Sequence, residues 1–571
     1  MRDTLRLFFF VALALSLLVL WTRWEKWQAA EQDAARSASQ SQRAPDSVIP
    51  GDAANNNDSQ LPVPSRTLVR ENTGGNVPTF GDVAAGDAAI TINAEWYVAE
   101  INENGGDIAA LRLKKHKTQI EDGEGEDFPL VRSDNAEVFL PQSGMTDAKG
   151  GSGFPYHKTR FVWQNPGGDK FAGENGAATV ILQAEGGGVI LQKRYVFRQT
   201  SYLTEVQLAA QNTSTAALSP FAYFQLAHDG RQPASHSALL PTFFGAAVYT
   251  DRDKFVKVPF DDIGEDDYPR LSDDGWIGFI QRYFAVAWLP EPGKHEFRMD
   301  KSKNGGGKAS VILPFGDIAP GESQTVSARL FAGAQEQDIL SRLNEDGTAP
   351  GIHLAVDYGW LTFIADLLYK LLALIHDYVG NWGVAIILLT LAVKLLFYPL
   401  SSASYRSMAK MKAEAPRIKQ LQERYANDKQ KMQQEMMALY RSKKINPLGG
   451  CLPVLVQIPV FIALYWVLLG SVELRHAPFG LWLADLSSPD PYFILPVMMG
   501  VAMFLQTKLS PAPPDPTQAM IMRFLPIGFA AFSIFFPSGL VVYWLSNTLL
   551  SIAQQWHITR GINKKTAGIV N

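Results

Sequence analysis

One cation in an apolar stretch is the residue of this chain whose chemistry most needs an explanation. Lys394 lies about two-thirds of the way along an apolar segment at 382–400. A charge in hydrocarbon costs on the order of 2.5–3.5 kcal/mol on insertion scales, so it must face protein or water. Helical side chains lean toward the helix N-terminus, which for a span entering from the outside takes Lys394 away from the nearer membrane surface. We therefore expect Lys394 to line a wet cavity, and snorkelling to the headgroups is the alternative.

Polar residues at helical spacing accompany this cation in neighbouring apolar segments. None of these segments contains an acidic residue that could neutralise Lys394. Hydrogen bonds between helices could satisfy uncharged side chains, but an unpaired cation indicates a solvated groove. The predicted groove residues beside Lys394 are Thr390, Gln457, Tyr543, Asn547 and Ser551.

A short apolar segment at 521–536 predicts a locally thinned membrane beside this groove. Phe524 to Phe536 would extend about 20 Å at about 1.5 Å per residue, against a hydrocarbon core of about 30 Å. Short spans thin the bilayer around them. We expect an apolar slide between groove and lipid, formed by Ile458, Pro459, Phe529 and Phe532.

The distribution of apolar and basic segments predicts six membrane spans. Residues 1–27 contain an apolar run that ends in tryptophans without a small-residue cleavage site, which favours an uncleaved signal-anchor over a removed secretory signal. Residues 401–446 contain eleven Lys and Arg against four acids, so this loop and both termini are predicted to be cytoplasmic. The other spans are predicted at 382–400, 448–470, 491–508, 521–536 and 538–556.

The chain between the first two spans is predicted to be periplasmic. Residues 28–81 are rich in small and polar residues and indicate a flexible linker. Residues 82–345 alternate apolar and polar side chains between glycine-rich turns, which predicts an antiparallel β-sandwich. Its candidate polar clusters, at 228–229 and 265–267, are interpreted as solvated loops. We predict no catalytic residue, metal or cofactor, and the chain has no glycine-rich phosphate loop and only one cysteine.

Two amphipathic regions flank the first core span. Residues 351–378 have a wide apolar face and a narrow polar stripe, typical of a helix lying in the membrane interface. Residues 401–446 repeat apolar residues at three and four positions, which predicts a cytoplasmic hairpin of two helices. A solvated charged loop is the alternative, but the methionines favour an adaptable partner surface. Its predicted residues are Met408, Met411, Lys412, Arg417, Met432 and Met436.

Several of these stretches together resemble the bacterial YidC insertases. The matching motifs include Gly380-Asn-Trp-Gly383, Tyr398-Pro-Leu400, Asn446-Pro-Leu-Gly-Gly-Cys451, Asp490-Pro-Tyr492 and Phe536-Pro-Ser-Gly539. The resemblance implies a periplasmic β-sandwich similar to galactose mutarotases, without that activity. It also implies a five-span core at 379–560 with a hydrophilic groove, followed by a short basic tail at 561–571. In the best-known members the groove cation is an arginine, so Lys394 keeps the charge but loses the bidentate geometry.

The resemblance implies an insertase of the cell inner membrane that is not an enzyme. It would integrate nascent membrane proteins and help them fold, alone or with the Sec translocon, with the ribosome and the lipid bilayer as further partners. No recognition of nucleic-acid sequence is expected. Two alternatives from other classes are a secondary transporter, which would predict repeated spans, and a membrane-tethered periplasmic enzyme acting on sugars.

Overall fold

The computed structural model describes most of the chain after residue 89. The described residues are 90–118, 125–133, 137–147, 153–171, 176–231, 243–264, 269–301, 306–425, 428–443, 452–509 and 516–567. The predicted signal-anchor at 1–27, the linker at 28–81 and the acidic run at 265–267 lie outside them, as do Cys451 and the last four residues of the tail.

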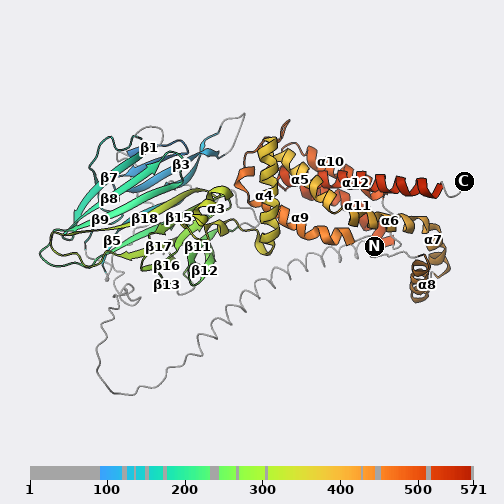
Figure 1. The fold of residues 1–571 in the computed structure, drawn as a ribbon, viewed down its shortest axis with the longest axis horizontal. Helices are drawn as coiled ribbons and strands as arrows, with labels where there is room; N and C mark the ends of the chain where they lie inside the picture. Colours follow the sequence, from blue (N-terminus) through green and yellow to red (C-terminus); the bar gives the residue numbers. More distant parts are fainter. Residues whose placement is uncertain are drawn as a thin grey trace, which may run out of the picture.

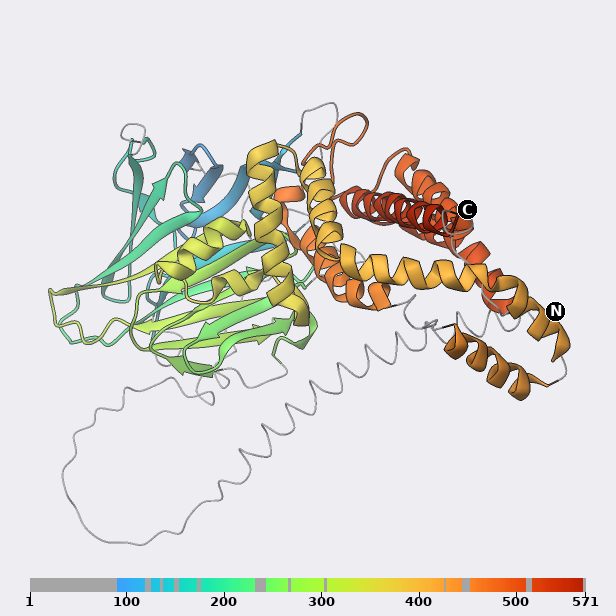
Figure 2. The ribbon, with the colours of Figure 1, turned by 45° about the vertical axis from the view of Figure 1, so that its right-hand side comes forward.

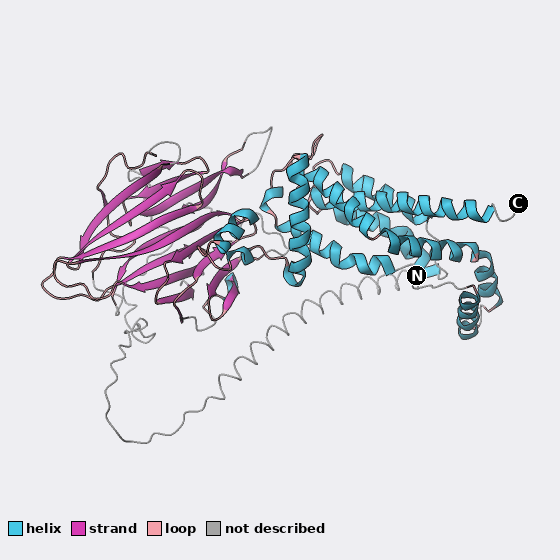
Figure 3. Ribbon diagram, viewed as in Figure 1, coloured by secondary structure: helices cyan, strands magenta, loops and turns pink. Residues whose placement is uncertain are grey.

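Two antiparallel sheets of nine strands each form the first half of the described chain (Figure 1; Figure 3). The first sheet has the order β1 (Ile90–Asn93), β2 (Tyr97–Asn102), β3 (Asp107–Lys117), β4 (Asp127–Ser133), β5 (Val138–Thr146), β10 (Phe221–His228), β17 (Gly307–Pro314), β16 (His295–Lys301) and β13 (Pro269–Ser272). The second sheet has the order β12 (Lys254–Pro259), β11 (Gly245–Thr250), β14 (Trp276–Ile280), β15 (Phe284–Pro290), β18 (Ser323–Ala334), β9 (Leu203–Asn212), β8 (Val189–Arg198), β7 (Ala177–Gly186) and β6 (Val162–Trp163). The predicted antiparallel β-sandwich is confirmed.

Strict alternation explains why these strands form a two-layer core. In β9, Val206, Leu208 and Ala210 are completely buried, whereas the residues between them are partly exposed. A period of two places one set of side chains on the inner face of a sheet. Between the two sheets, Trp288 Nε1 of β15 donates to the carbonyl of Gln225 in β10 at 3.0 Å. The sandwich therefore satisfies the polar atom of its large buried indole.

The interpretation of His228 as part of a solvated loop was wrong. His228 is fully buried at the end of β10, and its Nε2 lies 3.1 Å from a carboxylate oxygen of Glu137. Its ring packs against Phe139 and Phe244. A period-two pattern cannot place a residue at the end of a strand inside or outside when the next loop folds over it.

The second half of the described chain is helical (Figure 2; Figure 3). Its elements are α3 (Gln337–Glu345), η2 (Ile352–Ala355), η3 (Gly359–Leu361), α4 (Thr362–Val379), α5 (Trp382–Leu396), α6 (Tyr398–Ala413), α7 (Ala415–Arg424), α8 (Lys429–Ser442), α9 (Leu452–Gly470), η5 (Val472–Leu474), α10 (Ile494–Leu509), α11 (Pro516–Ser533) and α12 (Ser538–Ala567). By length and composition, no helix in the described ranges could cross a membrane alone, and only α5 and α6, bent by 67°, meet that test as a pair.

Two helices predicted to be continuous are broken. The interfacial helix begins at Thr362 rather than at 351, because Asp357 accepts the backbone N–H of Gly359 at 2.7 Å and pairs with Lys257 at 2.9 Å. These contacts hold an extended residue, Val356, between η2 and η3. In the cytoplasmic region, Pro416 in the first turn of α7 separates α7 from α6, because proline has no backbone N–H to donate.

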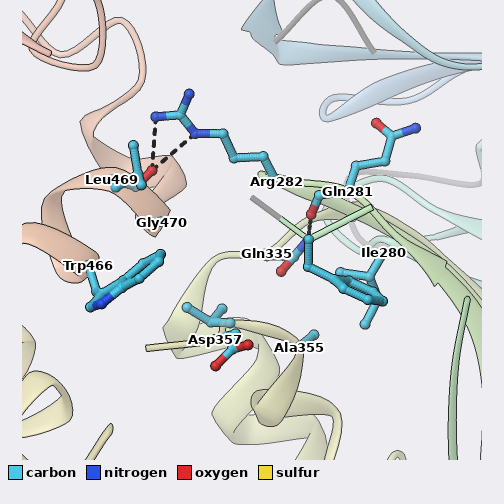
Figure 4. Close-up of a pocket in the computed structure, with 11 residues that line it drawn as sticks. Ile280, Gln281, Arg282, Gln335, Ala355, Asp357, Trp466, Leu469 and Gly470 are labelled. Carbon is cyan, nitrogen blue, oxygen red and sulfur yellow. Dashed lines mark hydrogen bonds between the residues drawn. The ribbon is translucent and has the colours of Figure 1, made fainter. Parts of the chain in front are cut away.

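Polar contacts join the sandwich to the end of α9. Arg282, which follows β14, donates through Nε and Nη2 to the carbonyl of Leu469, both at 3.1 Å. Figure 4 shows this fork at a cavity of about 130 Å³ between the two halves of the chain. Beside it, Glu473 accepts the backbone N–H of Gln337 at 3.0 Å and the hydroxyl of Tyr369 at 2.9 Å. The sandwich, α4 and the end of α9 therefore share one buried polar joint.

This joint predicts a pH-dependent stability. Burial raises the pKa of Glu473 above its ordinary value of 4.5, although the hydrogen bonds from Gln337 and Tyr369 oppose the shift. The folded protein therefore binds this proton more tightly than the unfolded chain does. Its stabilising effect is complete below the ordinary pKa and is lost as the pH rises through the folded pKa.

The measurement is the melting temperature of the detergent-solubilised protein between acidic and neutral pH. In the parent, the melting temperature should fall as the pH rises. In Glu473→Gln this fall should be smaller, because the amide does not titrate. Glu205→Gln, at a half-exposed ion pair on the sandwich, should keep the parent's slope. Equal slopes in the parent and Glu473→Gln would contradict the prediction.

Candidate functional site

The loop at 471–493 fixes the starts of the two helices that carry the groove residues. Asn381, the N-cap of α5, accepts the backbone N–H of Val384 at 3.0 Å and donates through Nδ2 to the carbonyl of Phe479 at 3.2 Å. Ser538, the first residue of α12, donates through Oγ to the carbonyl of Asp485 at 2.8 Å. Because the same loop holds both starts, α5 and α12 keep a defined register along their contact.

Lys394 lies in the last turn of α5 and is buried against α12. Its side chain is only 4% exposed, and Nζ donates to Ser551 Oγ at 2.8 Å. The Ser551 hydroxyl in turn donates to the backbone carbonyl of Asn547 at 2.6 Å. No ion pair found among the described residues includes Lys394. The structure thus places Ser551 directly beside Lys394, as a neutral partner, and links it to Asn547 through the backbone carbonyl of Asn547.

The other predicted groove residues lie farther from the charge. Thr390 is buried, and its hydroxyl donates to the carbonyl of Ile386 in its own helix at 2.7 Å. Tyr543 is buried two turns before Ser551, where its ring packs against Phe461 of α9 at 5.9 Å. Gln457 is half-buried on α9. Among the described residues, no side-chain hydrogen bond joins these three predicted groove residues to Lys394.

Two further residues lie beside Lys394: Gln554 continues the predicted polar stripe of the last span, whereas Tyr405 was not predicted. Gln554 donates through Nε2 to the carbonyl of Lys394 at 3.3 Å, at the end of α5 where helical carbonyls lack intrahelical partners. Tyr405 of α6 donates to the carbonyl of Ser551 at 3.5 Å. The sequence feature that could have indicated Tyr405 is Pro399. A bend at this proline lets the face of α6 that carries Tyr405 approach α12.

The predicted slide residues divide between lipid-facing and packed positions. Ile458 and Phe532 are 43% and 51% exposed, as a surface open to lipid requires. Phe529 instead packs against Trp544 of α12 at 4.6 Å, and Phe461 of α9 stacks on the same indole at 5.3 Å. Trp544 therefore lies between α9 and α11. Pro459, inside α9, is half-buried.

The hairpin predicted at 401–446 uses part of its predicted partner surface for its own packing. Met411 and Met436 pack against the small core formed by Ile418 and Tyr440, so they are not free for a partner. Met408 and Met432 are half-buried. Lys412 and Arg417 are exposed, and Arg417 pairs with Glu414 at 3.1 Å. The exposed part of this surface is basic rather than methionine-rich.

No cluster suited to a metal accompanies these residues. Within the described ranges, no group of three or more His, Cys, Asp or Glu side chains lies close enough together to hold a metal ion. The predicted groove side chains are a cation, hydroxyls and amides; the charge of Lys394 attracts anions, and the hydroxyls and amides can bond to polar backbone. The chemistry that this arrangement supports is transient binding of a polar or acidic chain segment.

Two family models together match nearly all of the described chain. The model described as "YidC periplasmic domain" matches residues 89–371, and the one described as "60Kd inner membrane protein" matches residues 374–565. A membrane protein insertase YidC from Nitrosospira multiformis is 45% identical over 99% of this chain and 98% of its own length. One from Aromatoleum aromaticum is 46% identical over 99% of both chains. These relatives are named as insertases, not as enzymes or transporters.

Solved structures with related folds are more distant in sequence. A crystal structure of an active YidC insertase with its first transmembrane domain resolved is 17% identical, with a TM-score of 0.38 over 82% of this chain and 92% of that one. A galactose mutarotase related enzyme from Lactobacillus acidophilus is 10% identical, with a TM-score of 0.28 over 43% of this chain and 97% of that one.

The bond between Lys394 and Ser551 predicts that replacing two buried serines by alanine lowers the free energy of unfolding by unequal amounts. Ser551→Ala should lower the free energy of unfolding by about 2 kcal/mol, because a buried charged donor loses its acceptor. Ser533→Ala should cost less, at about 1 kcal/mol or below, because Ser533 is equally buried but donates to Ala530 within its own helix.

Thermal unfolding in detergent measures both variants. In the double variant Lys394→Met, Ser551→Ala, the loss should be smaller than the sum of the single losses, since neither group is left unpaired. Strict additivity, or equal costs for Ser551→Ala and Ser533→Ala, would show that the bond contributes nothing.

Proposed function

Because this chain belongs to the YidC family of membrane protein insertases, we propose that the polar cluster at Lys394, Asn547 and Ser551 receives the translocating segment of its substrates. The family is one of inner-membrane proteins with a periplasmic domain, and this chain inserts proteins into that membrane. The observation that carries the proposal is the burial of Lys394 with a neutral observed partner. A cation held in this way can exchange its partner for a better one.

A substrate carboxylate is a better acceptor for Lys394 than the Ser551 hydroxyl. The bond to Ser551 already has a charged donor, and a carboxylate would add the attraction between opposite charges to it. An acidic residue near the end of a nascent chain would therefore displace Ser551 and hold the polar segment in the groove. Lysine presents a point charge and not the bidentate guanidinium of arginine. It therefore binds one carboxylate oxygen, and the complex dissociates more easily. Transient binding is what translocation of a short polar segment requires.

Transfer of the apolar segment into lipid supplies the driving force. Burying apolar chain gains about 0.8 kcal/mol per CH₂ group, so a membrane span of the substrate outweighs the cost of moving a short polar tail. Ile458 of α9 and Phe532 of α11 are exposed on helices that both pack near Trp544. The substrate span would leave along these two helices and enter the bilayer as it does so.

The parts outside the groove have supporting roles in this proposal. The helix α4 lies in the periplasmic interface and fixes the tilt of α5, with both termini of the chain in the cytoplasm. The exposed basic residues of the hairpin, such as Lys412 and Arg417, and the tail at 561–571 receive the ribosome or the nascent chain. The Sec translocon would deliver larger substrates, and small ones would insert without it. The predicted division into signal-anchor, linker, sandwich and five-span core belongs to the same proposal.

Charge reversal in the groove tests the electrostatic step. Lys394→Arg should retain insertion, whereas Lys394→Glu should insert a substrate with an acidic translocated tail about tenfold less, a loss of about 1.4 kcal/mol. The matched control is the same substrate with its tail carboxylates changed to amides, which should suffer less. Insertion is measured by protease protection in proteoliposomes at equal protein levels. Equal loss for both tails would contradict the role of charge.

Photo-crosslinking tests the exit path. Crosslinkers at Ile458 and Phe532 should capture the apolar segment of a stalled substrate, because both side chains face outward on the proposed slide. Leu505 of α10 is the matched control, since it is 49% exposed but lies on a helix outside the path. Its capture should be far lower. Equal capture at all three positions would mean that substrates follow no defined path.

A further inference from the structure

A tight turn between α9 and α10 presents one leucine almost entirely outside the protein. Leu481 is 95% exposed at the tip of this turn. The turn is closed by the backbone N–H of Leu483, which donates to the carbonyl of Gly480 at 3.1 Å, and by that of Phe479, which donates to the carbonyl of Leu483 at 3.0 Å. The leucine is therefore held away from the chain by a hydrogen-bonded frame.

The backbone of this turn is strained at the leucine itself. Leu481 has φ of 58°, in the left-handed region that a branched side chain rarely adopts. Of the four non-glycine residues with positive φ in the described part of the chain, three lie between 476 and 493: His476, Leu481 and Phe493. Strain of this kind persists where the surrounding structure imposes it, and it concentrates at functional segments.

Hydrogen bonds fix the turn to the ends of two core helices. On one side, Asn381 at the start of α5 donates to the carbonyl of Phe479 at 3.2 Å. On the other side, Trp482 Nε1 donates to a carboxylate oxygen of Asp490 at 3.0 Å. The other oxygen of Asp490 accepts the backbone N–H of Leu495 in the first turn of α10 at 2.6 Å. The tip of the turn thus has a set position relative to α5 and α10.

Exposed apolar faces lie on both sides of the turn. On α4 the outward residues include Phe363, Leu367 and Tyr378, and on and before α10 they include Phe493, Val497 and Val501. Figure 1 shows α4 standing across the ends of α5 and α9, between the helices and the sheets. In Figure 2 the orange segment between α9 and α10 projects beside the corner formed by α4 and α5. The turn therefore lies close to helices that expose apolar side chains.

We propose that Leu481 and its turn insert into the periplasmic leaflet of the membrane, as an anchor separate from α4. From Ala477 to Ala484 the sequence has no charged residue, so the tip suits hydrocarbon and not an acidic or basic partner. A protein partner would need a polar rim around an apolar centre, whereas the helices next to this turn expose apolar side chains. In an inner-membrane protein, an exposed apolar turn that is bonded to the start of α10 is expected to contact lipid.

Labels in proteoliposomes without substrate test this anchor. In a Cys451→Ser background, a cysteine at Leu481 would carry an environment-sensitive nitrobenzoxadiazole fluorophore. The vesicles contain phosphatidylethanolamine and phosphatidylglycerol, with spin-labelled lipids that quench either near the headgroup or near the terminal methyl. The matched control is Leu271 in β13, which is 63% exposed on the sandwich. Val497 on α10 serves as the lipid-facing reference.

The anchor predicts blue-shifted emission at residue 481 and stronger quenching by the spin label near the headgroup than by the deep one. The label at residue 271 should emit as it does in water and be unquenched. An emission at 481 equal to that at 271 would overturn the proposal. So would a blue shift that lipid quenchers do not affect but that depends on protein density, because another copy of the chain would then cover the turn. The melting temperature in detergent should not change with the label, since the Leu481 side chain is almost fully exposed. No substrate is present, so the outcome is independent of the proposed role of Lys394.

Discussion

The hydrogen bond from Lys394 to Ser551 is the contact on which the arrangement of the core depends. It holds a charge inside a helical region with a neutral acceptor, and such a charge is tolerated only where protein or water surrounds it. Ser551 in turn bonds to α12's own backbone, and Gln554 of the same helix donates to the carbonyl of Lys394 near the end of α5. The register of α5 against α12 therefore follows from satisfying one cation and one helix end.

The periplasmic loop at 471–493 makes that register possible from the other end of the helices. Although burial would raise the pKa of Asp485, hydrogen bonds from His476, Ser488 and Ser487 hold it well below its ordinary value. The carboxylate therefore stays charged and orders the loop that positions Asn381 and Ser538. On its outer side the loop reaches the sandwich through Arg475, which donates to the carbonyl of Lys117. The position of Lys394 against α12 is thus also fixed by contacts at the opposite ends of these helices.

This coupling changes how the β-sandwich should be regarded. It has the layered core of a self-sufficient domain, and its inner face is largely apolar apart from the buried pair of Lys193 and Asp107. Yet Arg282, which follows one of its strands, binds the C-terminal carbonyl of α9, and Glu473 bonds to the backbone of Gln337 at the start of α3. A helix end needs partners for its last carbonyls, and here the sandwich supplies one. The helix that carries Ile458 is thereby oriented from the periplasmic side.

The sequence by itself determined which residues must be explained and which elements exist. Residue types and spacing alone predict an unpaired Lys394 in an apolar segment, period-two strands, and a polar stripe through Asn547 and Ser551, because burial and helical period act locally. The described strands run from 90 to 334, and the predicted sandwich range up to 345 also includes the helix α3. Only the tertiary structure decided that Ser551 is the partner of Lys394, and that Tyr405 joins them after the bend at Pro399. It also placed Met411 and Met436 inside the hairpin and His228 inside the sandwich. Those outcomes depend on which faces meet across long sequence separations, and one residue's spacing to its neighbours carries no information about that.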